Sequence, residues 1–460
     1  FKDYAFMDSY EFIWLANTPT FQYQFISGGR PLYALLNQLV YGFFCNTISD
    51  LKWVRFFSLI GCVIFSIQVF QFLLKLKMKK LESGFFAILI FSIPSFTTFI
   101  NWSATYQVPW ALIMSFSAGL ILMNIFKNKK INILKYLASI LLVVISLCLY
   151  QSVATAFLLP FVFLTVINKN IELKTIIQLL VFLFIAFAIY FLVFRLTLNW
   201  YGIEQNNRSE INLIKLPLEV IVFYLSELRT IIPGSGLFIW NPLFFTLGLI
   251  TFLGFFKKLK NEKYTVLAFL FFVIALTYLP NLLSIDNFKS TRSIGPAATI
   301  LLFYQFYFLQ QLSIKRKTIK MASLMLGSLL LIISFFNANN YFNGIQNKEY
   351  TALKIAFEKI PLSNTNNIIF ITPKQDFLQK NGFSKYIYAD EYGQVSTYKA
   401  WVSPALFNQL LKERAISENF KISDLHNYKI KVFTIDKKYS NDDNSIEINL
   451  NNILKKELRK

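Results

Sequence analysis

Acidic residues gather at the start of the chain, at Asp3, Asp8 and Glu11. Asp8 and Glu11 are three positions apart, so a helix over residues 9–16 would place both carboxylates on one side of its first turn. A carboxylate in such a site can take the proton from an attacking hydroxyl group. The same spacing is also that of a capping box, in which Asp8 caps the helix and Glu11 hydrogen-bonds back to its amide. Both roles stay open.

The motif Gly28-Gly29-Arg30-Pro31 follows this acidic segment. Pro31 suits the first position of a helix and the glycines suit a turn, so the motif predicts a turn that enters a helix. Glycines also let the backbone approach a ligand closely, and a guanidinium group can bind phosphate through two hydrogen bonds. Arg30 is therefore a candidate phosphate ligand.

The composition indicates that this polar segment lies beside a membrane. Hydrophobic residues make up 55% of the 460 residues and charged residues only 15%, which is typical of a polytopic membrane protein. The net charge of +21 comes from short clusters between apolar runs, a pattern that favours cytoplasmic loops over a nucleic-acid-binding face. His426 is the only histidine, and the three cysteines form no CxxC pair. We expect no cofactor; a divalent metal between carboxylates and a phosphate is compatible with the sequence but not required.

Apolar runs near the length that crosses about 30 Å of hydrocarbon alternate with polar or basic loops. Basic clusters occupy every second loop, the bias expected of cytoplasmic loops. An extracytoplasmic start then requires one more span before Phe1, which we expect to be missing from this chain. The pattern predicts about ten spans in a core over 51–337, at residues 51–74, 84–101, 108–126, 133–149, 152–167, 175–198, 236–256, 264–281, 293–311 and 320–337.

Residues 1–50 are expected to form an extracytoplasmic loop and an amphipathic helix at the membrane interface. If residues 31–46 instead crossed the bilayer, the N-terminus would be cytoplasmic. A stretch of about fifteen residues that contains Asn37 and Gln38 suits an interfacial helix better than a crossing.

Basic residues near the outer ends of spans are further candidates for phosphate contacts. Arg292 opens a span on the side where basic residues are usually avoided, which favours a ligand role for it. Lys289 lies three positions earlier. Arg55, Arg195 and Lys289 are explained equally well by side chains that reach toward lipid headgroups.

Residues 338–460 differ from the core and are expected to form a small extracytoplasmic α/β domain. This part holds no cysteine and no glycine-rich phosphate loop. A cap or acceptor-docking module is therefore favoured over catalysis by Asp390-Glu391. The expected elements are a helix at 348–360, strands at 367–372 and 429–435, and a polar turn at 440–444.

Four short motifs occur in order: Phe6-Met7-Asp8-Ser9-Tyr10-Glu11, Gly29-Arg30-Pro31-Leu32, Leu149-Tyr150-Gln151-Ser152 and Thr291-Arg292-Ser293. Their order resembles the GT-C superfamily of membrane glycosyltransferases, and more narrowly the Gtr-type glucosyltransferases that decorate bacterial O-antigen. The resemblance covers most of residues 1–340. The family usually shows two adjacent aspartates, whereas here Ser9 takes the second place. Asp8 is then the expected base, and Glu11 is either a substitute carboxylate or a helix cap.

The resemblance implies transfer of a sugar, glucose by family default, from a polyprenyl-phosphate donor to a hydroxyl of a cell-surface glycan. The reaction would be a single inverting displacement at the outer face of the bacterial plasma (inner) membrane. The leaving group is a lipid phosphate, so no nucleotide site is needed. The residues assigned are Asp8 and Glu11 for catalysis, Arg30, Arg292 and Lys289 for the donor phosphate, and Asp3, Tyr150 and Gln151 for substrate, with Tyr150 and Gln151 also explained as plain turn residues.

A transporter or flippase for a lipid-linked glycan is the alternative function, favoured by the number of spans and by 51 phenylalanines. Transporters keep ionisable groups near the bilayer midplane, whereas here they gather at the outer ends of spans. A structural membrane protein is not excluded by any single residue, but it would leave the acidic cluster without a purpose.

Overall fold

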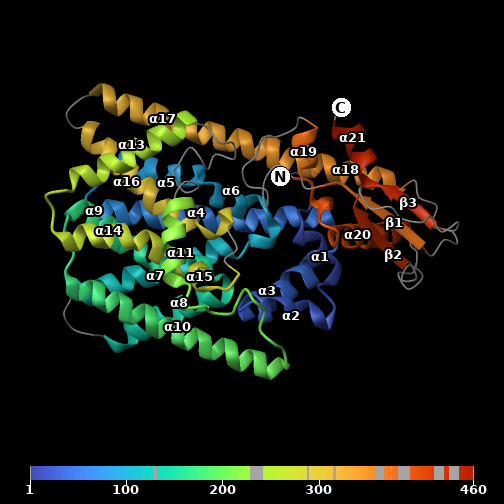
Figure 1. The fold of residues 1–460 in the computed structure, drawn as a ribbon, viewed down its shortest axis with the longest axis horizontal. Coiled ribbons are helices and arrows are strands. Elements are labelled where there is room, and N and C mark those ends of the chain that lie inside the picture. The colour runs from blue at the N-terminus through green and yellow to red at the C-terminus, as the bar shows by residue number, and fades with distance from the viewer. Residues whose placement is uncertain are drawn as a thin grey trace.

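The computed structural model describes residues 2–127, 132–227, 242–286, 290–313, 317–358, 367–374, 376–381, 394–418, 429–434 and 445–458. Long helices run side by side through one part of the molecule, and a small sheet with its helices forms the other end (Figure 1). The short helices of the opening segment lie between these two parts. The predicted helical core and C-terminal α/β part are both present.

The opening segment folds into short helices, as the turn and helix patterns predicted. The helix expected over residues 9–16 begins one residue earlier, and the next predicted helix begins at Pro31. The elements are α1 (Asp8–Leu15), η1 (Pro19–Gln22), α2 (Tyr23–Ser27), α3 (Pro31–Leu39), the π-helix η2 (Val40–Phe44) and η3 (Ile48–Asp50).

Helix α3 and the π-helix after it present an apolar stripe to the surface. Leu35, Leu39 and Phe43 are spaced four apart and are 49%, 43% and 73% exposed, whereas Tyr33 and Asn37 are buried. Residues on this spacing share one helix face. At about 1.5 Å per residue the stretch is roughly 21 Å long, shorter than the hydrocarbon core. This geometry supports a helix that lies on the membrane interface.

Each predicted span overlaps one to three consecutive helices of the core. In the described chain, five helical stretches are long and apolar enough to cross a bilayer, or six if a pair bent by 66° before Pro94 is one span. Proline at a first helical position ends the preceding helix. The number of crossings stays a prediction.

The elements of the core are α4 (Leu51–Lys75), α5 (Lys80–Leu89), η4 (Ile90–Ser92), α6 (Pro94–Asn101), η5 (Ser103–Thr105), α7 (Val108–Lys127), α8 (Ile133–Leu149), η6 (Gln151–Leu158), α9 (Leu159–Asn168), α10 (Leu173–Tyr201), α11 (Leu216–Val222), the π-helix η7 (Phe223–Glu227), α13 (Pro242–Lys258), α14 (Tyr264–Leu276), α15 (Leu279–Leu283), η8 (Thr291–Ser293), α16 (Gly295–Ser313) and α17 (Lys317–Asn337).

Arg55 lies in the first turns of α4 and is fully buried. Its guanidinium group donates hydrogen bonds to the carbonyl oxygens of Tyr4 and Lys2, at 2.8 and 2.5 Å, and lies 4.0 Å from the centre of the Tyr4 ring. The lipid-headgroup explanation is therefore wrong for Arg55, because this side chain fastens the start of the chain to α4.

The C-terminal part contains a parallel sheet of three strands in the order β2-β1-β3. Two strands were predicted almost to the residue, whereas β3, in which only two apolar residues alternate, was missed. The turn expected at 440–444, and Asp390-Glu391, lie outside the described residues. The elements are the π-helix η9 (Ala338–Asn343), α18 (Gly344–Glu358), β1 (Asn367–Thr372), α19 (Phe377–Lys380), η10 (Ser396–Tyr398), α20 (Val402–Glu418), β2 (Lys429–Thr434), β3 (Ser445–Asn449) and α21 (Leu450–Leu458).

The opening segment and the C-terminal part share one hydrophobic core. The Phe6 and Phe342 rings meet edge to face with centroids 4.8 Å apart. The backbone amide of Ile48 donates to the Glu413 carboxylate at 2.7 Å. Buried aromatic pairs of this kind stabilise an interface beyond the area that they bury. The C-terminal part is therefore packed directly against the segment that carries Asp8.

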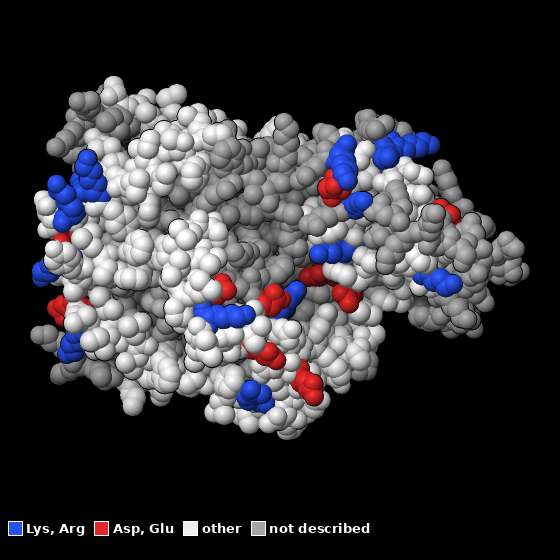
Figure 2. All heavy atoms as spheres, viewed as in Figure 1, with Lys and Arg blue, Asp and Glu red and all other residues white. Residues whose placement is uncertain are grey.

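Charged residues are unevenly distributed over the surface. On the face drawn in Figure 2, the described Lys, Arg, Asp and Glu side chains lie at one end of the bundle, near its junction with the C-terminal part and on that part itself, and the flank of the bundle between its two ends is almost free of charge. Such a band suits insertion into a bilayer.

Candidate functional site

A cavity of about 400 Å³, the arginine cavity, lies where the turn at Gly28, the start of η6, the second half of α10 and residues 208–213, 280–286 and 290–293 meet. Four of the predicted ligands line it: Arg30, Tyr150, Gln151 and Arg292. They come from three motifs far apart in the sequence, which the fold brings together. Lys289 lies outside the described residues.

Three guanidinium groups converge on this cavity, those of Arg30, Arg208 and Arg292. Burial lowers the pKa of Arg30, and the positive charges of Arg292 and Arg208 lower it further. Arg208 also lies 3.6 Å from Asp286, which lines the cavity together with Glu210. Three cations against two carboxylates in a confined space make a site that favours an anion such as a phosphate.

Arg292 is held in place by its neighbours. The guanidinium group of Arg292 lies 4.3 Å from the centre of the Trp102 ring, and the Phe6 ring lies 4.9 Å from the same Trp102 ring. The hydroxyl of Ser95 in α6 donates to the carbonyl of Thr291. A cation over an indole face is attracted by the ring electrons. This stack connects Arg292 to the segment that carries Asp8.

The turn that presents Arg30 is fixed by two side chains from the core. The Gln151 amide nitrogen donates to the carbonyls of Gly28 and Gly29 at 3.0 and 2.9 Å, and the Tyr190 hydroxyl donates to Gly29 at 2.7 Å. Gly29 has φ +76°, and a Cβ there would lie 2.5 Å from the Tyr190 oxygen. Only glycine fits, so the turn is a structural requirement and Gln151 positions Arg30. Its contact with substrate stays a prediction.

Helix α10 gives the cavity an aromatic side. Phe184, Phe187, Phe191 and Phe194 recur every three or four positions, so they share one helix face, and all four line the cavity. Phe184 is 75% exposed. The cavity therefore joins a cationic end to an apolar helix face, an arrangement that suits an amphiphile with an anionic head.

Arg208 and the phenylalanine face were missed from the sequence, although both carry a readable signal. Arg208 lies in a loop predicted to be extracytoplasmic, where the positive-inside bias makes arginine unusual. That reasoning had selected Arg292. The phenylalanines have helical spacing within a long span, which by itself is typical of any buried face.

Helix α1 begins at Asp8, but the residue in the capping position is Met7 and no side chain caps the helix. The capping-box alternative for Asp8 and Glu11 is therefore wrong. Burial, and then repulsion from the Asp8 carboxylate, raises the pKa of Glu11 to about 6. The two carboxylates thus interact, as their spacing predicted.

Asp8 does not line the arginine cavity, but Tyr33 links the two. Burial raises the pKa of Tyr33, and Arg30, Asp8 and Arg292 all act on it electrostatically. The two cations lower that pKa, whereas Asp8 raises it. The buried Tyr33 side chain therefore lies within electrostatic reach of Asp8 and of two arginines of the cavity.

The backbone just before Asp8 is strained and is held by the C-terminal part. Met7 has φ +42°, a region that non-glycine residues rarely adopt, and its amide donates to the Ser396 hydroxyl at 3.2 Å. The amides of Ser396 and Thr397 in turn donate to the fully buried Glu349 carboxylate at 2.7 and 2.9 Å. This Glu349–Ser396 network was not predictable from the sequence, because its members are far apart in the chain.

Ser9, which stands where the family has its second aspartate, is fully buried, and its oxygen lies 2.7 Å from that of Ser103. A neutral hydroxyl pair avoids the cost of burying a second charge beside Asp8. Asp3 lines a different hollow of about 560 Å³ together with Lys52 and Lys354. The structure thus does not bring Asp3 to the arginine cavity. Among the described residues, no three His, Cys, Asp or Glu side chains form a metal site.

The family model for the glucosyl transferase GtrII matches residues 6–309. The chain belongs to this family. The predicted Gtr-type family is thereby confirmed, and the chain is an enzyme of the transferase class. No curated protein matches the chain. The GtrII match begins two residues before Asp8, includes the whole arginine cavity, and leaves out Asp3 and the C-terminal sheet.

Proposed function

We propose that this GtrII-family protein transfers a sugar, glucose by family default, from a polyprenyl-phosphate donor to a hydroxyl of a cell-surface glycan. The observation that carries the proposal is the arginine cavity, in which three guanidinium groups lie next to the phenylalanine face of α10. A lipid-linked sugar phosphate has the matching halves, an anionic head and a long apolar chain. The membrane would be the bacterial plasma membrane, with the cavity on its outer side.

The reaction is one displacement at the anomeric carbon of the donor sugar. Asp8 takes the proton of the acceptor hydroxyl as its oxygen bonds to that carbon. The bond from the carbon to the phosphate oxygen breaks at the same time, so the configuration inverts. The phosphate leaves with its electron pair, and Arg30 and Arg292 stabilise the charge that develops on it. Arg208 and Lys289 are further candidates for this contact.

Asp8→Asn tests the proposal, with Asp376→Asn as the control, because the Asp376 carboxylate lies in the C-terminal part and pairs with Lys380 at 2.7 Å. The measurement is transfer of radiolabelled glucose from a synthetic polyprenyl-phosphate glucose to membrane glycan at equal protein levels. Removal of a general base should lower the rate by at least about two orders of magnitude, and the control should keep it.

Two results would contradict the proposal. If Asp8→Asn were as active as the parent, the base would have to be Glu11 or Asp3. If the parent transferred nothing from any of several donors, transport of a lipid-linked glycan would replace transfer as the proposed function.

A further inference from the structure

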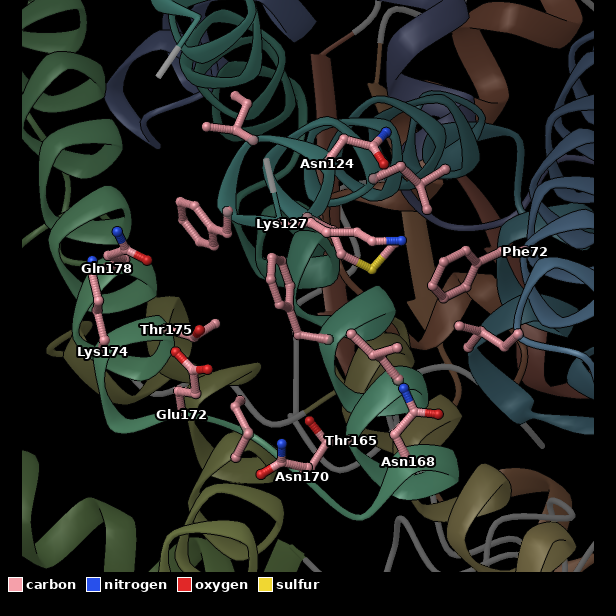
Figure 3. Close-up of a pocket in the computed structure, with 18 of the residues that line it drawn as sticks. Phe72, Asn124, Lys127, Thr165, Asn168, Asn170, Glu172, Lys174, Thr175 and Gln178 are labelled. Carbon is pink, nitrogen blue, oxygen red and sulfur yellow. The ribbon is translucent and has the colours of Figure 1, made fainter. Parts of the chain in front are cut away.

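A second and larger cavity, the lysine cavity, lies at the other end of α10 from the arginine cavity. Its volume is about 1400 Å³, and the ends of α4, α7, α8, α9 and α10 surround it. Figure 3 shows Lys174 and Gln178 of α10 on one side and Phe72 of α4 on the other. Its loops are those predicted to face the cytoplasm.

The charge of the lysine cavity favours an anion. Lys75, Lys127 and Lys174 line it, each from a different helix, against the single carboxylate of Glu172 among its described lining residues. Loop lysines are expected at this end of a membrane protein. Three that converge on one space from separate helices also make a site for a phosphate, which Lys binds as a point charge.

Polar side chains extend the cavity into the bundle. Gln68 lies seven positions before Lys75 in α4, about 10 Å deeper along the helix. Its amide nitrogen donates to Ser117 at 3.0 Å, whereas its buried side-chain oxygen has no partner among the described residues. A buried acceptor left unpaired is costly, so Gln68 offers a place for a hydroxyl of a bound molecule.

The apolar part of the cavity continues along α10. Lys174, Gln178 and Val181 line the lysine cavity, and Phe184 and Phe187 line the arginine cavity. At about 100° per residue, Lys174, Gln178 and Val181 lie together on one side of the helix, and Phe184 and Phe187 turn progressively away from it. The lysine cavity thus opens onto apolar residues of α10, against which a lipid chain can lie.

We propose that the lysine cavity binds the phosphate headgroup of a membrane lipid from the leaflet on the side of the lysine-rich loops. The lysines contact the phosphate, Gln68 accepts a hydrogen bond from a hydroxyl of the head, and the chain lies along α10. A phospholipid such as phosphatidylglycerol and a polyprenyl-phosphate lipid share this chemistry. The proposal requires no catalytic activity of the protein.

The test compares two triple variants that remove the same charge at the same end of the molecule. Lys75→Gln with Lys127→Gln and Lys174→Gln changes the cavity. Lys257→Gln with Lys260→Gln and Lys263→Gln changes the end of α13 and the loop after it. None of these three lysines lines the cavity, and the loop is held by an ion pair between Glu262 and Lys169 at 2.9 Å. Both are made in an Arg30→Gln background so that the arginine cavity contributes less.

Binding is measured by native mass spectrometry of the delipidated full chain with phosphatidylglycerol, a polyprenyl phosphate and a diacylglycerol, which lacks phosphate. The cavity variant should bind the phosphate lipids at least about tenfold more weakly than the background, and the loop variant should match the background. Diacylglycerol binding should not change. The phosphate lipid with the larger loss identifies the source.

A charge-neutral variant, Val181→Trp, fills the cavity from an exposed position on α10 and should weaken the same lipids. Equal binding by the cavity variant and the background would overturn the proposal. So would an equal loss in the loop variant, because the effect would then be one of general surface charge.

Discussion

The carboxylate pair at the start of α1 predicts a pH dependence. Burial and Asp8 raise the pKa of Glu11 to about 6, so Glu11 ionises as the pH rises through that value. Its negative charge then makes Asp8 a stronger base. We expect kcat/KM for transfer to rise between about pH 5 and 7, with an apparent pKa near 6, and Glu11→Gln to remove this rise and lower the rate at neutral pH by up to about tenfold.

The raised pKa of Glu11 also makes the stability of the protein depend on pH. A carboxyl group whose pKa is raised by folding stabilises the folded state at pH values below its unfolded-state pKa of 4.5. This contribution is lost as the pH rises through the folded-state pKa of about 6. Glu11→Gln should therefore raise the melting temperature at alkaline pH and leave it unchanged in acid. If kcat/KM did not rise with an apparent pKa near 6, Glu11 would have no part in the mechanism.

Gly29 and Gly202 form a matched pair for a second prediction. Both have positive φ, +76° and +63°, but a Cβ at Gly29 would meet Tyr190 and Gln151, whereas at Gly202 it would meet nothing within 4 Å. Gly202→Ala should cost only the backbone strain of about 1–2 kcal/mol. Gly29→Ala should cost more and also raise the KM for the donor, because it displaces Gln151 and with it Arg30. Equal thermal unfolding and equal KM in the two variants would contradict this.

Single residues were predicted unequally well, for physical reasons. Arg30 was found from the glycine turn that precedes it, and Arg292 because a cation at the outer end of a span is unusual. Arg55 also lies near the outer end of a span, but its guanidinium group donates hydrogen bonds to the backbone carbonyls of Lys2 and Tyr4 instead of binding a ligand. These carbonyls lie more than fifty positions away in the chain, and spacing alone does not reveal them.

Packing of the C-terminal part against α1 predicts that this part sets the position of Asp8. Ser396→Ala removes the acceptor of the Met7 amide and should lower kcat by several-fold to about tenfold with little change in donor KM, because a small misplacement of a catalytic group is costly. Ser403→Ala is the control, since this buried serine hydroxyl has no partner among the described residues.

The conservative variant Ser396→Thr keeps a hydroxyl and should restore most of the activity. Each hydrogen bond contributes about 1 kcal/mol to stability, so the melting temperatures of the three variants should differ little. A loss of activity in proportion to lost stability would mean that Ser396 is structural only.

Helices and strands that have a clear sequence pattern of their own were predicted. Elements whose structure depends on pairing or packing with distant segments were not. The apolar runs place the long core helices but not α11 and η7, which lie between two predicted spans, and the β-branched runs place β1 and β2. Strand β3 has the short sequence Ser-Ile-Glu-Ile-Asn and owes its state to pairing with β1. Pro94 predicts that the preceding helix ends before it. The 66° angle between the two helical segments depends on the helices that pack around them.

At the scale of the whole molecule, the two cavities lie at opposite ends of α10 and differ in their cations. The arginine cavity meets the opening segment, and the lysine cavity lies beside the basic helix ends. Positive charge that is held by lysines at helix ends in one cavity and by packed arginines in the other is consistent with the predicted cytoplasmic and outer ends of a membrane enzyme.

That orientation can be measured, because the three native cysteines are buried. Burial also raises the pKa of Cys45 to about 12, so it presents almost no thiolate to a maleimide at neutral pH. We expect Lys380→Cys, which is 62% exposed in the C-terminal part, to react with a membrane-impermeant maleimide in intact spheroplasts. Lys260→Cys, in the loop between α13 and α14, should react only after permeabilisation. The reverse pattern would place Asp8 and the arginine cavity in the cytoplasm, where a donor presented from the outer leaflet could not reach them.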